Sequence, residues 1–393
     1  MTSTVFVINS GSSSVKYQLI NPETGESLAS GLAERIGETN GHLRHKAAGE
    51  VVDLEMPLPD HSVALREVKK LFDTTGPRLE DAGIVAVGHR IVQGGKHFSG
   101  PALITQAVYD KIVELVPLGP LHNPAHLLGI DVAKEIFPDL PHVAVFDTAF
   151  FQTLPNEAAT YALKRDVAEK YEIRRYGAHG TSHQFVSGLA CDYLQREDLK
   201  QVTLHLGNGA SASAVAGRQA IDTSMGLTPL EGLVMGTRTG DIDPAAVFHL
   251  QRVAGMTFEE VDTLFNKQSG MKGLCGDNDM REVWARVDRG EADAIEATEV
   301  YVHRLLRYVG AYTAELGGLD ALVFTAGIGE NDNRTRAALC KRLEFMGLKL
   351  DEAANNERGD GLRVISTPDS TVTVMIIPTN EEWAIAQQAM TLV

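Results

Sequence analysis

The chain has 393 residues and a formal net charge of -16, with 44% hydrophobic and 22% charged residues. This length exceeds what one hydrophobic core usually serves, so we expect two domains, and the ordinary composition excludes a disordered chain. The acidic balance argues against non-specific binding to nucleic acid or to an acidic membrane surface, because such binding requires a basic face.

The cysteines and the chain start indicate the compartment. Cys191, Cys275 and Cys340 lie far apart and form no CxxC pair. Neither a disulfide framework nor a thiolate zinc cage is expected, which suits a reducing compartment. The first basic residue is Lys16, so no basic segment precedes an apolar leader, and no apolar run reaches the ~18 residues of a membrane span. We expect a soluble cytoplasmic protein.

Short β-rich runs alternate with helical patterns along the chain. Apolar residues at helical spacing predict a helix over residues 297–316, ended by Gly317 and Gly318. Strands are predicted at VFVI, VAVG, VAVFD, VTLHLG, ALVFTAG and VTVMIIP. This alternation predicts an α/β fold with helix-covered sheets.

The opening pattern returns half way along the chain. Around Gly11 and again around Gly209, 198 residues later, a strand runs into a turn of small residues and out into a second strand. Two halves built alike explain this pattern, although Gly and Ser are too common for one match to decide.

Three glycine-containing turns are candidate phosphate sites. The turns at Gly11 and Gly209 expose N–H and hydroxyl donors, but an ordinary hairpin turn also favours Ser and Gly. The stretch with Gly327 and Gly329 has the order strand, glycine loop, helix start, which favours anions. P-loop and Rossmann motifs are absent, so a nucleotide would be held by hairpin turns in two similar halves.

Charged and imidazole side chains stand at the ends of several predicted strands. His89 and Arg90 end one predicted strand, and Asp147 ends another. The Asp147 carboxylate can be interpreted either as a helix N-cap or as a group that binds a ligand. His122 lies in a loop that Pro120 and Pro124 hold.

Other polar stretches also have two interpretations. His179 and His183 have the spacing of a zinc-binding helix, but Gly180 replaces the required Glu, so an anion-binding or turn-capping role is favoured. The long loop 222–244 carries Arg238, and long irregular loops are usually functional. Glu381 and Glu382 stand at a helix start, where acids are normally structural.

Taken in order, these stretches closely resemble the acetate kinase family. The resemblance rests on NSGSSSVK, GHRIVQGG, PLHNP, FDTAF, YGAHGTSH, HLGNGAS, the DTSMG to GDIDP loop, FTAGIGEN and PTNEE, which together span nearly the whole chain. It implies two duplicated ribonuclease H-like α/β domains of the sugar kinase, Hsp70 and actin type, with ATP in the cleft between them and a homodimer. We expect domains at residues 1–149 with the C-terminal helix 383–393, and at 150–382 on the nucleotide side.

The resemblance also implies roles for individual residues. Arg90 and Arg238 would face the carboxylate and the transferred phosphoryl group, with His179 and His122 as phosphoryl-stabilising histidines. Asp147, Asn9 and Glu381 would associate with Mg²⁺, with Mn²⁺ as an alternative and Glu382 ranked second to Glu381. The acyl pocket would comprise Val92, Leu121 and Pro229, and the ATP contacts would be Asn9, Ser12, Ser14, Lys16, His205, Asn208, Gly209, Gly327, Gly329 and Asn331.

Two positions depart from the family pattern. Gln93 and Phe151 stand where many members have His. Neither position should then supply an indispensable proton or charge. The two departures put the substrate preference of the enzyme in doubt.

The implied reaction is reversible transfer of phosphate from ATP to acetate, giving ADP and acetyl phosphate. A carboxylate with a pKa near ~4 is already ionised, so its attack needs no general base and Asp147 is better assigned to the metal. Propionate or butyrate kinase is the alternative within the family. A non-transferring ATPase and a sugar kinase are the alternatives from other classes.

Overall fold

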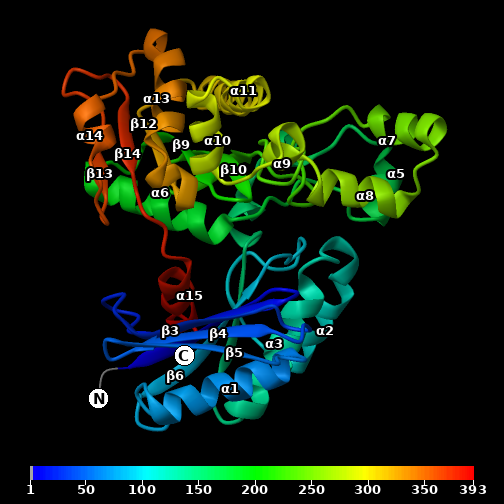
Figure 1. Cartoon of the computed structure of the whole chain (residues 1–393), viewed down its shortest axis with the longest axis vertical. Coiled ribbons are helices and arrows are strands. Elements are labelled where there is room, and N and C mark those ends of the chain that lie inside the picture. Colours follow the sequence, from blue (N-terminus) through cyan, green and yellow to red (C-terminus); the bar gives the residue numbers. More distant parts are fainter. Residues whose placement is uncertain (1–2) are drawn as a thin grey trace. The chain divides into compact units, whose positions relative to one another are not determined.

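The computed structural model describes residues 3–393. Two compact units are present: residues up to Gln152 with Asn380–Val393, and Thr153–Thr379 (Figure 1). The domain limits predicted at 149 and 382 lie three residues from the limits of these units and stay a prediction as domain boundaries. None of the helices in residues 3–393 is long and apolar enough to cross a membrane.

The first unit contains an eight-stranded sheet in the order β5-β4-β3-β2-β1-β6-β8-β7. Its strands are β1 (Thr4–Ser10), β2 (Ser14–Ile20), β3 (Ser27–Glu34), β4 (Gly41–Ala47), β5 (Glu50–Met56), β6 (Ile84–Ile91), β7 (Ala102–Leu103) and β8 (His142–Phe146). Its helices are α1 (His61–Thr74), α2 (Gln106–Glu114), η1 (Val116–Leu118), α3 (Asn123–Ile136) and α15 (Glu381–Met390), and η2 (Ala149–Thr153) follows β8.

The second unit contains a six-stranded sheet in the order β11-β10-β9-β12-β14-β13. Its strands are β9 (Lys200–Leu206), β10 (Ala210–Ala216), β11 (Gln219–Thr223), β12 (Ala321–Thr325), β13 (Arg363–Val364) and β14 (Thr373–Ile376). Its helices are α4 (Asn156–Ala159), α5 (Arg165–Lys170), α6 (Gly180–Leu194), α7 (Ala245–His249), η3 (Leu250–Ala254), α8 (Phe258–Lys267), α9 (Gly270–Cys275), α10 (Met280–Asp288), α11 (Ala292–Glu315), α12 (Ala326–Asn331), α13 (Asn333–Arg342), η4 (Glu344–Met346) and α14 (Glu352–Asn356).

The two sheets share one topology. In the first, β1 pairs antiparallel with β2 and parallel with β6, and β6 pairs parallel with β8. In the second, β9 pairs antiparallel with β10 and parallel with β12, and β12 pairs parallel with β14. The turns at Gly11 and Gly209 join equivalent strand pairs, so the predicted fold of two duplicated ribonuclease H-like domains is confirmed.

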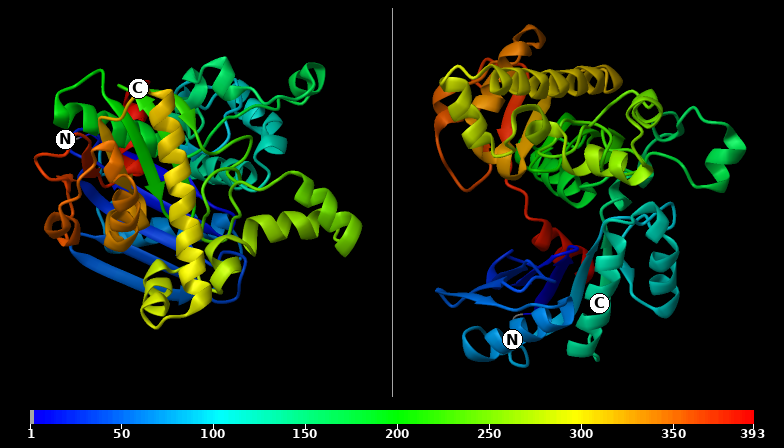
Figure 2. Two further views of the ribbon diagram at one scale, coloured as in Figure 1. Left: turned by 90° about the horizontal axis from the view of Figure 1, so that it is seen from above. Right: turned by 45° about the vertical axis from the view of Figure 1, so that its right-hand side comes forward.

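Strand alternation divides each core into two layers, because successive side chains point to opposite sheet faces. In β1, Phe6 and Ile8 pack with α1 and α3, whereas Val5 and Val7 pack with Ile385 of α15. In the second unit, apolar residues of β9 pack with apolar residues of α11, the long yellow helix in Figure 2. The opposite face of the sheet meets α6.

Three local expectations from the sequence need correction. Helix α11 begins at Ala292, five residues before the predicted start, and ends where Gly317 and Gly318 adopt positive φ. Gly327 and Gly329 lie in helix α12, because Ala326 with φ 65 turns the chain from β12 directly into a helix. Pro124 lies in the first turn of α3 instead of a loop, since that turn needs no proline N–H.

Candidate active site

Three neighbouring strands of the first unit end in polar side chains. β1, β6 and β8 run parallel to one another. Asn9 stands near the end of β1, Arg90 near the end of β6, and Asp147 directly after β8. Parallel strands end at the same sheet edge, which is where open α/β sheets bind ligands. The fold therefore brings these three predicted residues together.

Arg90 and Asp147 form a buried ion pair. Nη2 of Arg90 donates to Oδ2 of Asp147 at 2.7 Å, and Nε faces both carboxylate oxygens at 3.1 and 3.3 Å. Nη1 reaches Oδ1 of Asn9 at 3.4 Å. Burial opposes the charge on Arg90, but the carboxylates of Asp147 and Glu381 outweigh it and raise the pKa of Arg90. The guanidinium is thus held in place as a permanent cation.

The two glutamates at the start of α15 have different environments. Oε1 of Glu382 lies 2.6 Å from Nζ of Lys16, in an ion pair. Oε1 of Glu381 is buried and has no hydrogen-bond partner within residues 3–393. Burial raises the pKa of Glu381, and the positive charge of Arg90 opposes this increase. Glu381 therefore has an oxygen that a ligand can still satisfy.

The residues at this sheet edge fit a magnesium ion. Mg²⁺ usually binds one or two carboxylates and completes its shell with water and substrate phosphate. Asn9, Asp147 and Glu381 offer amide and carboxylate oxygens, and the open Oε1 of Glu381 is a buried acceptor that a cation would satisfy. Across residues 3–393 there is no group of three or more His, Cys, Asp or Glu arranged as a complete protein cage.

The other predicted residues of the first unit lie at its surface or close beneath it. Val92 follows β6 and is buried, whereas 49% of Leu121 is exposed. His122 is the N-cap residue of α3. Ser12 lies in the β1–β2 turn and is exposed, and Ser14 begins β2 and is half-buried.

In the second unit, histidines gather at the start of α6. His179 is the N-cap residue and has φ 60, a left-handed conformation that His tolerates better than most residues. Its Nδ1 lies 2.9 Å from Oγ of Ser211, and its ring stacks on His205 at 4.2 Å. Nε2 of His183 lies 2.7 Å from the same Ser211 Oγ. The two histidines thus meet at a β10 hydroxyl, and no metal-ligand group includes them in the described chain.

The loop after β11 brings Arg238 to the β9–β10 turn. A Cβ placed on Gly209 would lie 3.5 Å from Cε1 of His179 and 3.6 Å from Nη1 of Arg238, so these three residues are neighbours. Nη1 of Arg238 donates to the carbonyl of Pro229 at 3.1 Å. Burial lowers the pKa of Arg238, and within residues 3–393 no carboxylate pairs with it. Unlike Arg90, this guanidinium is partly desolvated and has no counter-ion among the described residues.

The β9–β10 turn is fixed from two sides. The carbonyl of Asn208 accepts from the N–H of Gly236 at 2.8 Å, and Oδ1 of Asn208 accepts from Nδ2 of Asn278 at 2.8 Å. The N–H of Gly207 donates to the carbonyl of Gly209 at 3.0 Å. Asn278 is a contact that the sequence did not identify, because it lies far along the chain in an unremarkable stretch.

Helix α12 begins beside this turn. Thr325 at the end of β12 pairs in register with His205 of β9. Gly329 faces β12 closely, since an added Cβ would lie 3.4 Å from the backbone carbon of Phe324. Nδ2 of Asn331 donates to the carbonyl of Gly327 at 2.9 Å within the helix. The predicted residues of this segment therefore lie near the turn, in a helix instead of a loop.

Both departures from the family pattern are buried. Oε1 of Gln93 accepts from the N–H of Gly95 at 2.8 Å, and the Gln93 backbone bonds the side chain of Asn123. Phe151 is fully buried. Gln93 therefore shapes a local turn and Phe151 fills the core.

Sequence reasoning missed a polar cluster behind the Arg238 loop. Nη2 of Arg175 donates to Oε1 of Glu231 at 2.7 Å, and Tyr161 OH donates to Oε2 of Glu231. Nη1 of Arg175 faces three successive loop carbonyls, beginning with Thr223 at 2.9 Å. Glu231 stood in the predicted functional loop, but nothing in the sequence linked it to Tyr161 or Arg175.

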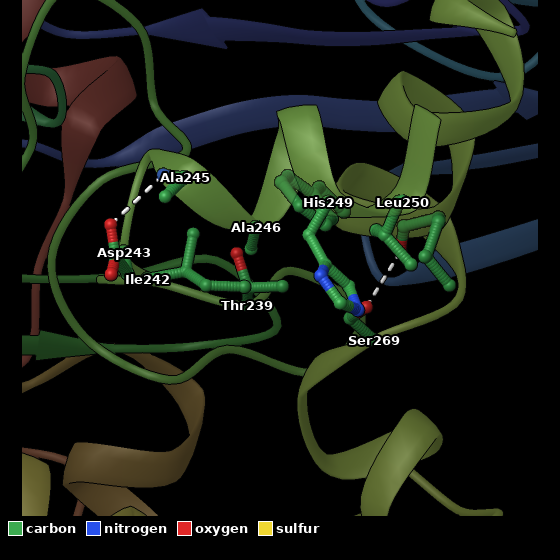
Figure 3. A pocket seen from close by; sticks show the side chains of 10 residues that line it. Thr239, Ile242, Asp243, Ala245, Ala246, His249, Leu250 and Ser269 are labelled. Atoms are coloured by element: carbon green, nitrogen blue, oxygen red, sulfur yellow. Dashed lines mark hydrogen bonds between the residues drawn. The ribbon is translucent and has the colours of Figure 1, made fainter. Parts of the chain in front are cut away.

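A separate pocket of about 570 Å³ lies in the second unit (Figure 3). Side chains from α7, η3 and α8 form much of its wall, and none of the predicted site residues lines it. The lining residues are Thr239, Ile242, Asp243, Ala245, Ala246, His249, Leu250, Leu264, Phe265 and Ser269.

The duplicated fold, with a glycine turn in each unit, Arg90 at a strand end and Arg238 in a loop, fits the class of two-domain actin-like ATPases and kinases. Residues 4–387 match the model of the Acetokinase family. The acetate kinase of Leifsonia xyli subsp. xyli is 54% identical over 390 residues, covering 99% of this chain and 98% of that relative.

Two solved structures are similar along the whole chain. A propionate kinase from Francisella tularensis has a TM-score of 0.95 and 43% identity, and each chain is covered completely. The Porphyromonas gingivalis acetate kinase has a TM-score of 0.93 and 43% identity, with 99% of each chain covered. The chain belongs to the acetokinase family, which confirms the resemblance seen in the sequence. It is accordingly an ATP-dependent phosphotransferase with a carboxyl group as acceptor.

Proposed function

We propose that this enzyme transfers the γ-phosphoryl group of MgATP reversibly to acetate, giving ADP and acetyl phosphate. The observation that carries the proposal is Arg238, a partly buried guanidinium with no carboxylate partner in the described chain, next to His179 and the Gly209 turn. A desolvated cation without a counter-ion favours an anionic ligand.

The central physical problem of this reaction is repulsion between two anions. Acetate must approach a polyphosphate on a protein whose net charge is -16. Arg238 and His179 would stabilise the phosphoryl group. Arg90, whose Nε and Nη2 face Asp147, would hold carboxylate oxygens through its remaining N–H groups. Such preorganised charges act at the transition state, where each contributes roughly 3 to 4 kcal/mol. His122 is proposed as a second phosphoryl-stabilising histidine.

Asp147 is not needed as a base. The carboxylate acceptor is ionised at neutral pH, with a pKa near ~4, so no proton has to be removed from it. Both oxygens of Asp147 also face Arg90. Asp147 thus orients Arg90 and offers charge for a metal.

The proposed metal site comprises Asn9, Asp147 and Glu381. A bound Mg²⁺ would neutralise charge on the phosphates during transfer. Lys16 pairs with Glu382 and leaves Glu381 open, which favours Glu381 as the metal-associated acid. The proposed ATP contacts remain Ser12, Ser14, Lys16, His205, Asn208, Gly209, Gly327, Gly329 and Asn331.

Acetate is favoured over propionate by the curated relatives. Those at 49–54% identity are named acetate kinases, as illustrated by the Leifsonia protein, and the solved structures at 43% identity include both a propionate kinase and an acetate kinase. Val92, Leu121 and Pro229 are the proposed acyl pocket. One methylene changes binding by only about 1 to 3 kcal/mol, so both acids require direct comparison.

The test is an assay of purified enzyme with MgATP and a panel of carboxylates, with acyl phosphate trapped by hydroxylamine. The proposal predicts a trapped product that depends on acetate and a lower kcat/KM for propionate and butyrate. ATP hydrolysis without trapped product would overturn the kinase assignment. A higher kcat/KM for propionate would overturn only the choice of acetate.

We also propose a homodimer. Phe248, Val253 and Phe258 on α7, η3 and α8 are 57%, 72% and 69% exposed, and exposed apolar side chains gathered along one segment favour an interface. Light scattering tests this, and a monomeric mass at micromolar concentration would contradict it. The three buried free cysteines support a reducing, cytoplasmic location, which cell fractionation tests.

A further inference from the structure

The Tyr161 hydroxyl ties together two points of the loop that carries Pro229. It accepts from the N–H of Leu227 at 3.1 Å and donates to Oε2 of Glu231. Leu227 and Glu231 stand two residues before and two residues after Pro229. One hydroxyl therefore closes the short segment 227–231 around this proline.

The same segment supports Arg238. The carbonyl of Pro229 accepts from Nη1 of Arg238 at 3.1 Å, so a displacement of Pro229 moves an acceptor of that guanidinium. The hydroxyl thus reaches Arg238 through a chain of two contacts. It touches neither Arg238 nor the Gly209 turn in any contact seen in residues 3–393.

Arg175 fixes Tyr161 and Glu231 in turn. Its guanidinium lies 5.6 Å from the centre of the Tyr161 ring, and Nη2 donates to Oε1 of Glu231 at 2.7 Å. The Tyr161 hydroxyl donates to Oε2, so both carboxylate oxygens of Glu231 accept a hydrogen bond. The side chains around the hydroxyl therefore have little freedom to compensate for its loss.

Backbone packing leaves no spare room at this junction. A Cβ placed on Gly226 would overlap both the Tyr161 hydroxyl and the Glu231 carboxylate. The carbonyl of Gly226 also accepts from the N–H groups of Tyr176 and Gly177 at 3.0 and 3.1 Å. Gly226 thus fits against the hydroxyl, and a methyl group there would push it away.

We propose that Tyr161 is a positioning residue that sets the shape of the acyl pocket by holding Pro229 and, through the Pro229 carbonyl, orients Arg238. This inference rests on the proposed function, in which Pro229 meets the acyl group and Arg238 the phosphoryl group. Acyl-chain selectivity is then partly determined by a hydroxyl that does not touch the substrate.

Tyr161→Phe tests the proposal, because it removes the hydroxyl and keeps the ring against Arg175. We expect kcat/KM for acetate to fall about fivefold to tenfold, because the two hydrogen bonds that hold segment 227–231 are lost. The ratio of kcat/KM for acetate to that for propionate should shift at least about threefold, because moving a wall of the pocket affects the binding of the two acids unequally. KM for ATP should change less than about twofold, since the hydroxyl makes neither of its hydrogen bonds with the Gly209 turn that would hold the nucleotide.

Two further variants separate positioning from general stability. Gly226→Ala attacks the same junction from the backbone and should shift the acid ratio in the same way. Tyr109→Phe, the matched control in the first unit, removes a hydroxyl that donates to Asp131 at 2.9 Å and should leave the ratio unchanged. A lower Tm in Tyr161→Phe with an unchanged acid ratio would overturn the proposal, because that result describes a stabilising contact only.

Hydrogen exchange of the amides of Leu227, Thr228, Leu230 and Glu231 gives a readout that does not depend on the substrate. Exchange there should be faster in Tyr161→Phe than in the wild type, and unchanged exchange would overturn the positioning role. If wild-type enzyme makes no acyl phosphate from any short acid, the proposed function fails, and the exchange result still decides whether Tyr161 holds the loop.

Discussion

Replacing Arg90 by Ala separates a structural role from a catalytic one. The variant removes the cation that faces the carboxylate of Asp147 and leaves that carboxylate buried. Both stability and turnover should fall, for different reasons. The experiment therefore needs a second substitution that restores one of them alone.

The stability loss follows from burial. The Asp147 side chain is fully buried and that of Arg90 is 19% exposed, so removing Arg90 takes a cation away from a buried carboxylate. Breaking such a pair costs roughly 3 to 5 kcal/mol, a large part of the ~5 to 15 kcal/mol that stabilises most proteins. Urea unfolding followed by circular dichroism should measure this loss.

The double variant Arg90→Ala/Asp147→Asn removes both charges. It should recover at least about 2 kcal/mol of the lost stability, because the neutral amide no longer needs a cation. Its turnover should stay at least about 100-fold below wild type, because the guanidinium that we propose holds the acceptor carboxylate is still missing. Steady-state kinetics on the folded double variant checks this directly.

Arg218→Ala is the matched control. Arg218 pairs with Asp192 and Glu197 at an exposed site, so its loss should cost under about 1 kcal/mol and leave turnover normal. If the double variant regained turnover together with stability, the loss in Arg90→Ala would come from unfolding. The catalytic role assigned to Arg90 would then be wrong.

Three other predictions follow from the structure. His179→Asn keeps a residue that tolerates φ 60 but removes the imidazole, so kcat should fall about 100-fold with an unchanged circular dichroism spectrum; near-normal kcat would exclude a catalytic His179. Burial and the nearby Asp222 raise the pKa of Glu315 from its usual 4.5 to about 7. Between pH 4.5 and about 7 the folded state therefore keeps a proton on Glu315 that the unfolded chain has released. The free energy of unfolding should accordingly fall as the pH rises through this window. Urea unfolding across this window should show a flatter fall in Glu315→Gln, and an equal fall would contradict the assignment. Gly25 has a φ of 75, and Gly25→Ala places a Cβ 2.7 Å from the Trp383 ring. The substitution should lower the free energy of unfolding by about 1 to 3 kcal/mol. An unchanged Tm would contradict tight packing of α15 at this position.

Much of the fold was readable because strand and turn signals are local. The alternation in β1 determines which side chains face α1 and which face α15, and small residues at Gly11 and Gly209 mark equivalent hairpins. The helix limits were less accurate. Ala326 shows why, since its positive φ starts α12 without a loop, and the sequence gives no sign that an alanine will adopt this conformation.

The amino-acid sequence by itself determined which reactive side chains are present and to which family the chain belongs, because motifs such as FDTAF and GTRTGDIDP are contiguous. Tertiary structure alone decided their partners. It placed Arg90 against Asp147, left Arg238 without a carboxylate within the described residues, and brought Tyr161 to a loop some seventy residues away. Ion pairing and burial depend on distances in space, and the strand order that sets those distances is a property of the folded sheet.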